Sequence, residues 1–370
     1  MSGSPSAPID HGARTRVVVD ALAHGDHGCD AWLFTDLVDV RWLTGFTGSN
    51  GWAVVRGDEV VLGTDLRYRE RAAEETASSG AVVVARQHAT DLHDELVARL
   101  RGCRHVGLDA ATTSHSTWER LAADLALVPS DSYVKVRRRV KDDAEIARIE
   151  AAAHATDLAL AEVEPLLLGT VDSPMTEADV RSELEYRMRR HGADDRSYDT
   201  IVATGPHHAA RPHHEAGRRT IVEGDTVIVD VGALVDGYHS DMTRSWVIGE
   251  ADDEQRELYE LVGISQRAGL DALAPGVAAR AVDDACRSVF VEAGYGEMYL
   301  HGTGHGVGLD IHEIPFQSPT SDDVLAAGMV VTVEPGLYRD GFGGFRIEDL
   351  VVVTDTGHRR MTQSPVRPLH

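Results

Sequence analysis

The sequence is poor in cysteine and contains no closely spaced cysteine pair. Its three cysteines, Cys29, Cys103 and Cys286, lie far apart along the chain. This spacing excludes a thiolate zinc site of the CxxC type and gives no support to a framework of disulfides. Unpaired cysteines are typical of reducing compartments, so we expect a cytoplasmic protein.

Basic residues are also scarce, because 36 lysines and arginines stand against 60 aspartates and glutamates and leave a formal net charge of −24. A surface of this sign repels phosphate backbones and anionic lipid headgroups, which argues against nucleic acid and membranes as partners. The sequence further lacks an uninterrupted apolar run of about 18 residues, the length that a membrane-spanning helix requires. Its first residues lack the apolar core of a secretion signal.

What the sequence does contain is the composition of a globular protein, with 370 residues of which 42% are hydrophobic and 26% charged. At about 150 residues per domain, this length predicts two domains. We expect residues 1–13 to form a flexible tail. In residues 14–137, short β-type apolar runs such as Ala31–Phe34 alternate with helical patterns, which predicts a small α/β domain.

The pattern changes near residue 138, and residues 138–370 combine longer helices with strands. Helical patterns run from Thr176 to Gly192 and from about Ala278 to Gly294, and each is followed by strands that carry acidic residues. This recurrence predicts two pseudo-symmetric halves. We expect an α+β domain in which apolar strands pair in one central sheet, the strands being 226–231, 330–333 and 350–353.

Acidic residues interrupt the apolar strands of this second domain. They are Asp230, Asp241, Glu334 and Glu348. Burying a lone carboxylate costs several kcal/mol or forces it to take up a proton. For each residue taken singly, an edge position or a structural salt bridge is the simpler explanation. The joint occurrence of four such residues favours a shared cation.

An imidazole ligand is available in the glycine-rich stretch HGTGHGVGLDIHEIP, which contains His301, His305 and His312. Glycines allow the close backbone approach that a segment folded around a site requires. Carboxylates together with one imidazole suit Mn²⁺, Fe²⁺, Co²⁺ or Zn²⁺. Two ions about 3.5–4 Å apart that share bridging carboxylates would use four carboxylates and one histidine.

The stretch HGTGHGVGLDIHE resembles the signature of the pita-bread metallopeptidases that include aminopeptidase P, prolidase and methionine aminopeptidase. In the first domain, LTGFTGSNGWAVV and TDLRY resemble the creatinase-type amino-terminal domain of Xaa-Pro peptidases, which methionine aminopeptidases usually lack. The resemblance implies a pita-bread catalytic domain of class α+β behind a smaller α/β creatinase-like domain. It assigns the ligands of two divalent metal ions to Asp230, Asp241, His305, Glu334 and Glu348.

The same resemblance implies peptide hydrolysis by a hydroxide bridged between two metals. Asp241 and Glu348 would bridge the ions, and Glu334 would also move a proton to the leaving amine. His312 would stabilise the oxyanion of the tetrahedral intermediate. The residues assigned to catalysis or substrate binding are His213, His301, His312, Glu334 and Arg346.

Phe316 marks a departure within this family. Some prolidases carry an arginine directly after the HExP segment, where it holds the free carboxylate of a dipeptide, and this sequence has Phe316 in HEIPF. We therefore count Phe316 among the substrate-binding positions and favour a metal-dependent Xaa-Pro aminopeptidase of the aminopeptidase P type. An Xaa-Pro dipeptidase (prolidase) is the alternative. A hydrolase of a non-prolyl small-molecule amide and a non-catalytic pita-bread binding protein are further alternatives.

The expected partners follow from the same resemblance. The substrate would be a peptide with proline at the second position, and the chain would form a homodimer or homotetramer. Carboxylate-rich ligation favours Mn²⁺, with Co²⁺, Zn²⁺ and Fe²⁺ left open. In the tract HHAARPHHE, His213 alone matches the family pattern, so we expect His207, His208 and His214 to face solvent.

Overall fold

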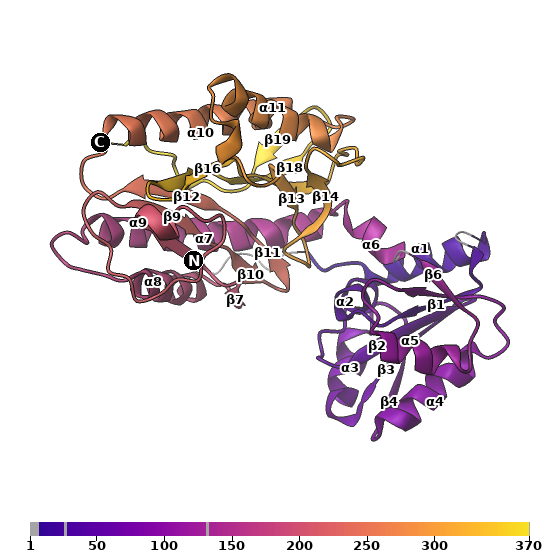
Figure 1. The fold of residues 1–370 in the computed structure, drawn as a ribbon. Coiled ribbons are helices and arrows are strands. Elements are labelled where there is room, and N and C mark those ends of the chain that lie inside the picture. Colours follow the sequence, from indigo (N-terminus) through magenta and orange to yellow (C-terminus); the bar gives the residue numbers. More distant parts are fainter. Residues whose placement is uncertain (1–6, 26–27, 131–132, 370) are drawn as a thin grey trace. The chain divides into compact units, whose positions relative to one another are not determined.

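The computed structural model describes residues 7–25, 28–130 and 133–369. The chain divides into two compact units, one of Pro8–Arg138 and one of Arg139–His370 together with Ala7, so the boundary falls one residue after the expected one (Figure 1). The expected tail is too long, because helix α1 begins at His11, where Asp10 caps it by accepting a hydrogen bond from the backbone N–H of Ala13. Residues 1–6 of the expected tail lie outside the described residues.

The first unit is built around one mixed six-stranded sheet in the order β4-β3-β2-β1-β5-β6. The strands are β1 (Ala31–Phe34), β2 (Gly51–Arg56), β3 (Glu59–Asp65), β4 (Val82–Arg86), β5 (Val106–Asp109) and β6 (Leu127–Ser130). The helices are α1 (His11–Ala23), α2 (Leu37–Thr44), α3 (Arg69–Glu75), α4 (Ala89–Leu100), α5 (His115–Ala122) and α6 (Tyr133–Arg138), with a 3₁₀ turn η2 (Leu66–Tyr68).

This sheet confirms the α/β reading of the first domain. The four residues of β1 are all buried, as a continuous apolar run predicts for a central strand. Strands β3 and β4 are parallel and are joined through α3, which makes one βαβ unit. Leu96 and Leu100 of α4 pack into the core formed by the sheet.

The second unit contains the longer helices α7 (Asp143–Leu168), α8 (Glu177–Arg190), α10 (Asp253–Ala272) and α11 (Ala279–Glu292), with the short α9 (Gly205–His208) and a 3₁₀ turn η3 (Gly296–Met298). Capping boxes start three of them, at Asp142, Thr176 and Asp252, where each cap and the residue three positions later exchange hydrogen bonds with the backbone. No helix among the described residues is long and apolar enough to cross a bilayer.

The strands of the second unit form several antiparallel sheets. One contains β12 (Thr243–Val247), β9 (Thr226–Asp230) and β8 (Ile201–Thr204). Another contains β14 (Glu313–Gln317), β13 (Gly304–Gly306), β15 (Val330–Val333), β18 (Asp349–Val353) and β19 (His358–Arg360). The remaining strands are β7 (Asp195–Arg196), β10 (Ala233–Val235), β11 (Tyr238–His239), β16 (Gly336–Arg339) and β17 (Gly343–Arg346).

The expected single central sheet is therefore wrong. Strand β9 pairs on its two edges with β8 and β12, while β15 pairs with β13 and β18. Because both edges of each strand are already hydrogen-bonded, β9 cannot join the sheet that contains β15 and β18. The two sheets belong instead to the two halves that the helix and strand recurrence predicts.

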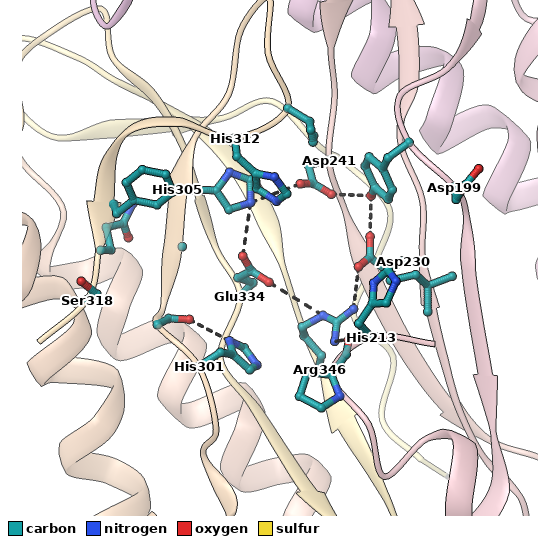
Figure 2. A pocket seen from close by; sticks show the side chains of 18 residues that line it. Asp199, His213, Asp230, Asp241, His301, His305, His312, Ser318, Glu334 and Arg346 are labelled. Carbon is teal, nitrogen blue, oxygen red and sulfur yellow. Dashed lines mark hydrogen bonds and ion pairs between the residues drawn. The ribbon is translucent and has the colours of Figure 1, made fainter. Parts of the chain in front are cut away.

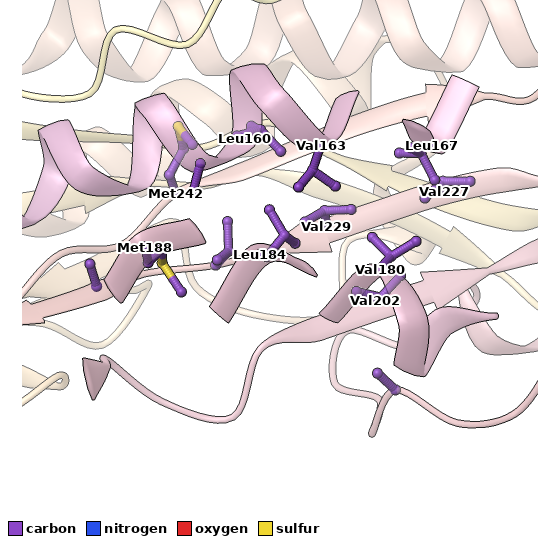
Figure 3. Close-up of a cluster of buried hydrophobic side chains, with 14 of the residues drawn as sticks. Leu160, Val163, Leu167, Val180, Leu184, Met188, Val202, Val227, Val229 and Met242 are labelled. Carbon is purple, nitrogen blue, oxygen red and sulfur yellow. The ribbon is translucent and has the colours of Figure 1, made fainter. Parts of the chain in front are cut away.

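A hydrophobic core holds the first of these halves together. Helices α7 and α8 lay their apolar faces on β8 and β9 (Figure 3). The contacting side chains include Leu160, Val163, Val180, Leu184, Val202, Val227 and Val229, all buried. Burial of each such side chain stabilises the fold by about 1.5–3 kcal/mol. This packing fixes β9 and so fixes the position of Asp230 at its end.

Candidate metal centre and substrate pocket

A pocket of about 600 Å³ lies within the second unit. Nine of the ten side chains that the sequence singles out line it (Figure 2), namely His213, Asp230, Asp241, His301, His305, His312, Phe316, Glu334 and Arg346. The tenth, Glu348, is buried beside them and accepts a hydrogen bond of 2.7 Å from the Thr243 hydroxyl. Residues from distant parts of the chain thus converge on one cavity.

The carboxylates gather because each lies at or within two residues of a strand end. Asp230 closes β9 and is the register partner of Thr243 in β12, and Asp241 lies two residues before that strand. Glu334 follows β15, and Glu348 lies between β17 and β18. Antiparallel pairing within the two sheets therefore carries all four acids toward the same pocket.

The distances within the group are short. The His305 Nε2 atom lies 3.4 Å from Glu334 Oε1 and 3.6 Å from Asp241 Oδ2. One ligand atom each of Asp241, His305 and Glu348 lies within 4.8 Å of the others, all three residues being buried. Like charges at this separation in a buried site cannot all ionise without compensation.

The pKa values also show that the site holds more carboxylates than it can keep ionised. Burial, together with the neighbouring carboxylates, raises the pKa of Asp241 and of Glu348 well above the usual range. Burial also raises the pKa of Glu334 to about 8, although Arg346 opposes the rise. Burial lowers the pKa of His305 to about 4, so its imidazole is neutral and its lone pair is available at pH 7.

These residues fit divalent metal ions. Glu348 Oε1 is buried and has no hydrogen-bond partner within the described part of the chain, which is a costly state for a carboxylate oxygen. A cation supplies both the missing partner and the missing positive charge. Carboxylate oxygens with one neutral imidazole are the donors that Mn²⁺, Fe²⁺, Co²⁺ and Zn²⁺ accept.

Arg346 is held in place beside the acidic residues of the pocket by several hydrogen bonds. Its guanidinium donates to Asp230 (2.6 Å), to the hydroxyl groups of Thr243 (3.0 Å) and Tyr338 (2.8 Å), and to the carbonyl oxygen of Pro212 (3.0 Å). These four bonds occupy most of its five N–H donors. Arg346 therefore orients Asp230 and has little capacity left to bind a substrate carboxylate.

The remaining pocket residues surround the cluster. The His312 ring stands edge-on to that of His305 with centroids 4.4 Å apart. His301 Nε2 lies 2.9 Å from the Tyr338 hydroxyl, and burial, aided by Arg346, lowers the pKa of His301 to about 4. The side chains of His213 and Phe316 are exposed in the pocket wall. His213, His312 and Phe316 are thus exposed to a bound molecule.

Tyr198 is a site residue that the sequence did not reveal. Its hydroxyl oxygen is within hydrogen-bonding distance of both Asp230 and Asp241, so it links two of the acids. Burial, with the two aspartates, raises the pKa of Tyr198 well above its usual value and keeps the phenol protonated. Tyr198 precedes β8 outside any glycine-rich or acidic motif, so no local signal distinguishes it from a core aromatic residue.

The expectation for the histidine tract is correct for His207, which is exposed, and wrong for His208 and His214. Both of these rings are partly buried against the carboxylate of Glu177, from α8. The folding of the 205–217 segment back onto α8 could not be read from a tract of polar residues.

Comparisons with known proteins agree with this architecture. Residues 147–355 match the model of metallopeptidase family M24, and residues 22–140 match the Creatinase/Prolidase N-terminal domain. The Xaa-Pro dipeptidase of Pyrococcus furiosus (strain ATCC 43587 / DSM 3638 / JCM 8422 / Vc1) is 36% identical over 332 residues, covering 88% of this chain and 91% of its own.

Two solved structures are similar over nearly their whole length. An Xaa-Pro dipeptidase from Bacillus anthracis superposes with a TM-score of 0.88 at 34% identity, covering 97% of this chain and 98% of its own. An X-Pro aminopeptidase from Thermotoga maritima MSB8 superposes with a TM-score of 0.86 at 31% identity, covering 96% of this chain and 99% of its own. The two-domain fold is thus shared with both types of enzyme.

Proposed function

The chain belongs to metallopeptidase family M24, and we propose that it is a metal-dependent Xaa-Pro aminopeptidase that releases the first residue from peptides with proline at the second position. The observation that carries a metal-dependent function is the buried group of Asp241, His305 and Glu348, whose carboxylates have raised pKa values although Arg346 lies nearby. The activities for which the relatives are named support the choice of an Xaa-Pro bond.

In this proposal the residues that hold two divalent ions, with Mn²⁺ as the favoured metal, are Asp230, Asp241, His305, Glu334 and Glu348. Two bound ions would lower the pKa of a water molecule toward neutrality, which would supply a nucleophile at pH 7. Glu334 takes a proton from the attacking water on its carboxylate and delivers it to the leaving amine nitrogen. His312 donates a hydrogen bond to the oxygen of the scissile carbonyl as negative charge develops there.

The other pocket residues position these groups and the substrate. Arg346 holds the carboxylate of Asp230, while His213 and His301 line the space beside the reacting carbonyl. The exposed ring of Phe316 offers an apolar surface of the kind that a proline ring or a following side chain would cover. Each of these roles is a proposal that substitution tests.

Arg346 also bears on the choice between aminopeptidase and dipeptidase. A dipeptidase must hold the free carboxylate of its substrate, for which arginine is the natural partner. Among the described residues that line the pocket, Arg346 is the only arginine. Its N–H groups already donate to other groups of the protein. A substrate that continues beyond proline places no carboxylate at that point and fits this pocket better.

A dipeptidase is the second candidate, because the relative from Pyrococcus furiosus and the structure from Bacillus anthracis both carry that activity in their names. Hydrolysis of a non-prolyl amide and a purely binding role are the remaining alternatives. The proposed assembly is a homodimer or homotetramer. The proposed compartment is the cytoplasm, which the free thiols of Cys29, Cys103 and Cys286 suit.

The deciding experiment compares Gly-Pro with Arg-Pro-Pro as substrates of the purified protein after chelation and reloading with Mn²⁺. We expect cleavage of the tripeptide with little cleavage of the dipeptide. Faster cleavage of Gly-Pro would establish the dipeptidase instead. Inactivity on both substrates by protein that holds two metal ions would refute both Xaa-Pro activities.

A further inference from the structure

Glu177 is a fully buried carboxylate outside the pocket, near the start of α8. Its side chain is 0% exposed. It accepts hydrogen bonds from the Thr204 backbone N–H (3.0 Å), the Thr204 hydroxyl (2.7 Å) and the Gly217 backbone N–H (3.1 Å). These three donors, which come from the residue before the 205–217 segment and from its last residue, fix the orientation of the carboxylate.

Two imidazoles complete the group. His208 Nδ1 lies 2.8 Å from Glu177 Oε1, and His214 Nε2 lies 3.1 Å from Glu177 Oε2. The two rings stack with centroids 4.0 Å apart and an interplanar angle of 30°. One ligand atom from each of the three residues lies within 4.8 Å of the other two. The side chains of His208 and His214 are 29% and 11% exposed, so solvent reaches the edge of the group.

We propose that Glu177, His208 and His214 bind one further divalent transition-metal ion, with Zn²⁺ as the best fit, at a site separate from the dinuclear centre. Two imidazole nitrogens and one carboxylate oxygen form a ligand set that zinc sites in proteins use, with a fourth position left to water. Imidazole-rich ligation favours Zn²⁺, Cu²⁺ or Ni²⁺ over the Mg²⁺ and Mn²⁺ that prefer oxygen.

The surroundings of Glu177 suit a ligand rather than only a hydrogen-bond acceptor. Five donors meet a carboxylate that has about four lone-pair positions, so the site is crowded when both imidazoles donate. When an ion binds, each imidazole shifts its proton to its other ring nitrogen, and the ion replaces the two imidazole donors. The bonds from Thr204 and Gly217 remain and orient the carboxylate, as such partners do at metal sites.

The neighbouring cation does not compete for the site. Arg219 donates to the Thr204 hydroxyl (2.7 Å), and its guanidinium pairs with Asp225 through bonds of 2.6 and 2.7 Å. Its charge is therefore balanced by Asp225, and the charge of Glu177 remains for the ion. Burial opposes ionisation of Glu177, but bonds from His208, Thr204 and Gly217 outweigh it, so its pKa lies below the usual value.

A bound ion would act on the segment that forms part of the pocket wall. His208 and His214 flank Pro212 and His213, which both line the pocket, and the Pro212 carbonyl oxygen accepts a bond from Arg346. Crosslinking His208 and His214 to α8 closes this short loop and reduces its freedom. The role of the ion is thus to hold the loop in place, and it takes no part in the reaction.

The test counts zinc directly and requires no turnover, so it stands or fails independently of the proposed function. The metal-stripped full-length protein is equilibrated with buffered free Zn²⁺. The number of zinc ions per chain is then measured by inductively coupled plasma mass spectrometry. The double variant His208→Asn/His214→Gln keeps an amide N–H near each imidazole donor position but removes both imidazole ligands. We expect this variant to bind one Zn²⁺ per chain fewer than the wild type.

The matched control is His207→Asn, which removes an exposed histidine from the same short helix. We expect the control to bind as many Zn²⁺ ions as the wild type. Equal zinc content in the double variant and the wild type would overturn the proposal, and so would an equal loss in the His207 control. If circular dichroism shows that the double variant is unfolded, the single variant His208→Asn replaces it, with a loss of zinc affinity of at least tenfold expected and unchanged affinity overturning the proposal.

Discussion

Asp241 connects two parts of the carboxylate cluster, because it contacts Tyr198 and lies 3.6 Å from His305. Asp241→Asn keeps the shape of the side chain and removes its charge. We expect the variant to lose bound metal. We also expect kcat/KM to fall by more than the factor of about 10–100 that is typical of residues that only orient a ligand. Metal content and turnover are measured together, with the exposed Asp253→Asn as control. Full metal content with normal turnover would show that Asp241 is not a ligand.

His312 tests the chemistry separately from metal binding. Its ring stands beside that of His305 in the pocket wall. His312→Ala would remove the proposed hydrogen-bond donor to the developing oxyanion, so we expect kcat to fall by about 10²–10³ while metal content stays unchanged. Steady-state kinetics with Arg-Pro-Pro as substrate give kcat and KM. A rise in KM alone would assign His312 to substrate binding instead.

At the scale of one element, strand β13 places His305 by lying unusually close to β15. A Cβ atom on Gly304 would stand 2.2 Å from the backbone carbonyl oxygen of Thr332. Gly304→Ala therefore forces the strands apart, at a cost of about 1–3 kcal/mol, and moves His305. We expect a lower unfolding midpoint together with weaker metal binding. Gly357→Ala, where a Cβ meets nothing within 4 Å, is the control that should change neither.

For the whole molecule, removing the metal should make stability fall as pH rises from about 6.5 to 8. The folded metal-free chain keeps the pKa of Glu334 near 8, whereas the unfolded chain ionises this group near its ordinary value of 4.5. The folded state therefore holds the extra proton, and its stability declines by about 1.4 kcal/mol per pH unit until the folded pKa is passed. Asp241 and Glu348, whose pKa values are also raised, act in the same direction.

The histidines oppose this decline near the lower end of the window. His301 and His305 have pKa values lowered from 6.5 to about 4, so the stability they contribute is lost as pH falls from above 6.5 toward 4. At pH 6.5 the unfolded imidazoles are still about half protonated, so their effect ends only about one pH unit higher. Denaturant unfolding of metal-free and Mn²⁺-loaded protein at constant ionic strength measures the effect. A gap between the two forms that stays constant from pH 6.5 to 8 would contradict it.

The sequence alone determined features that depend on local patterns. The apolar run of β1 predicted a buried strand, and the Thr176 cap predicted the start of α8. The α+β class and the two-domain organisation are confirmed by the fold and the family matches. The acids in apolar strands pointed to the pocket because an unpaired buried charge is costly wherever it occurs. Such signals need no knowledge of which strands are neighbours.

Tertiary structure decided what depends on contacts between distant residues. Strands β9 and β15 lie in different sheets because backbone hydrogen bonds with other strands occupy both edges of each. Tyr198 reaches Asp241 from 43 residues away, and His214 reaches Glu177 from 37 residues away. Neither pair has a spacing that marks it in sequence. Hydrogen bonds of this kind form only when packing of the helices on the sheets has brought the segments together, since ordering such contacts costs chain entropy.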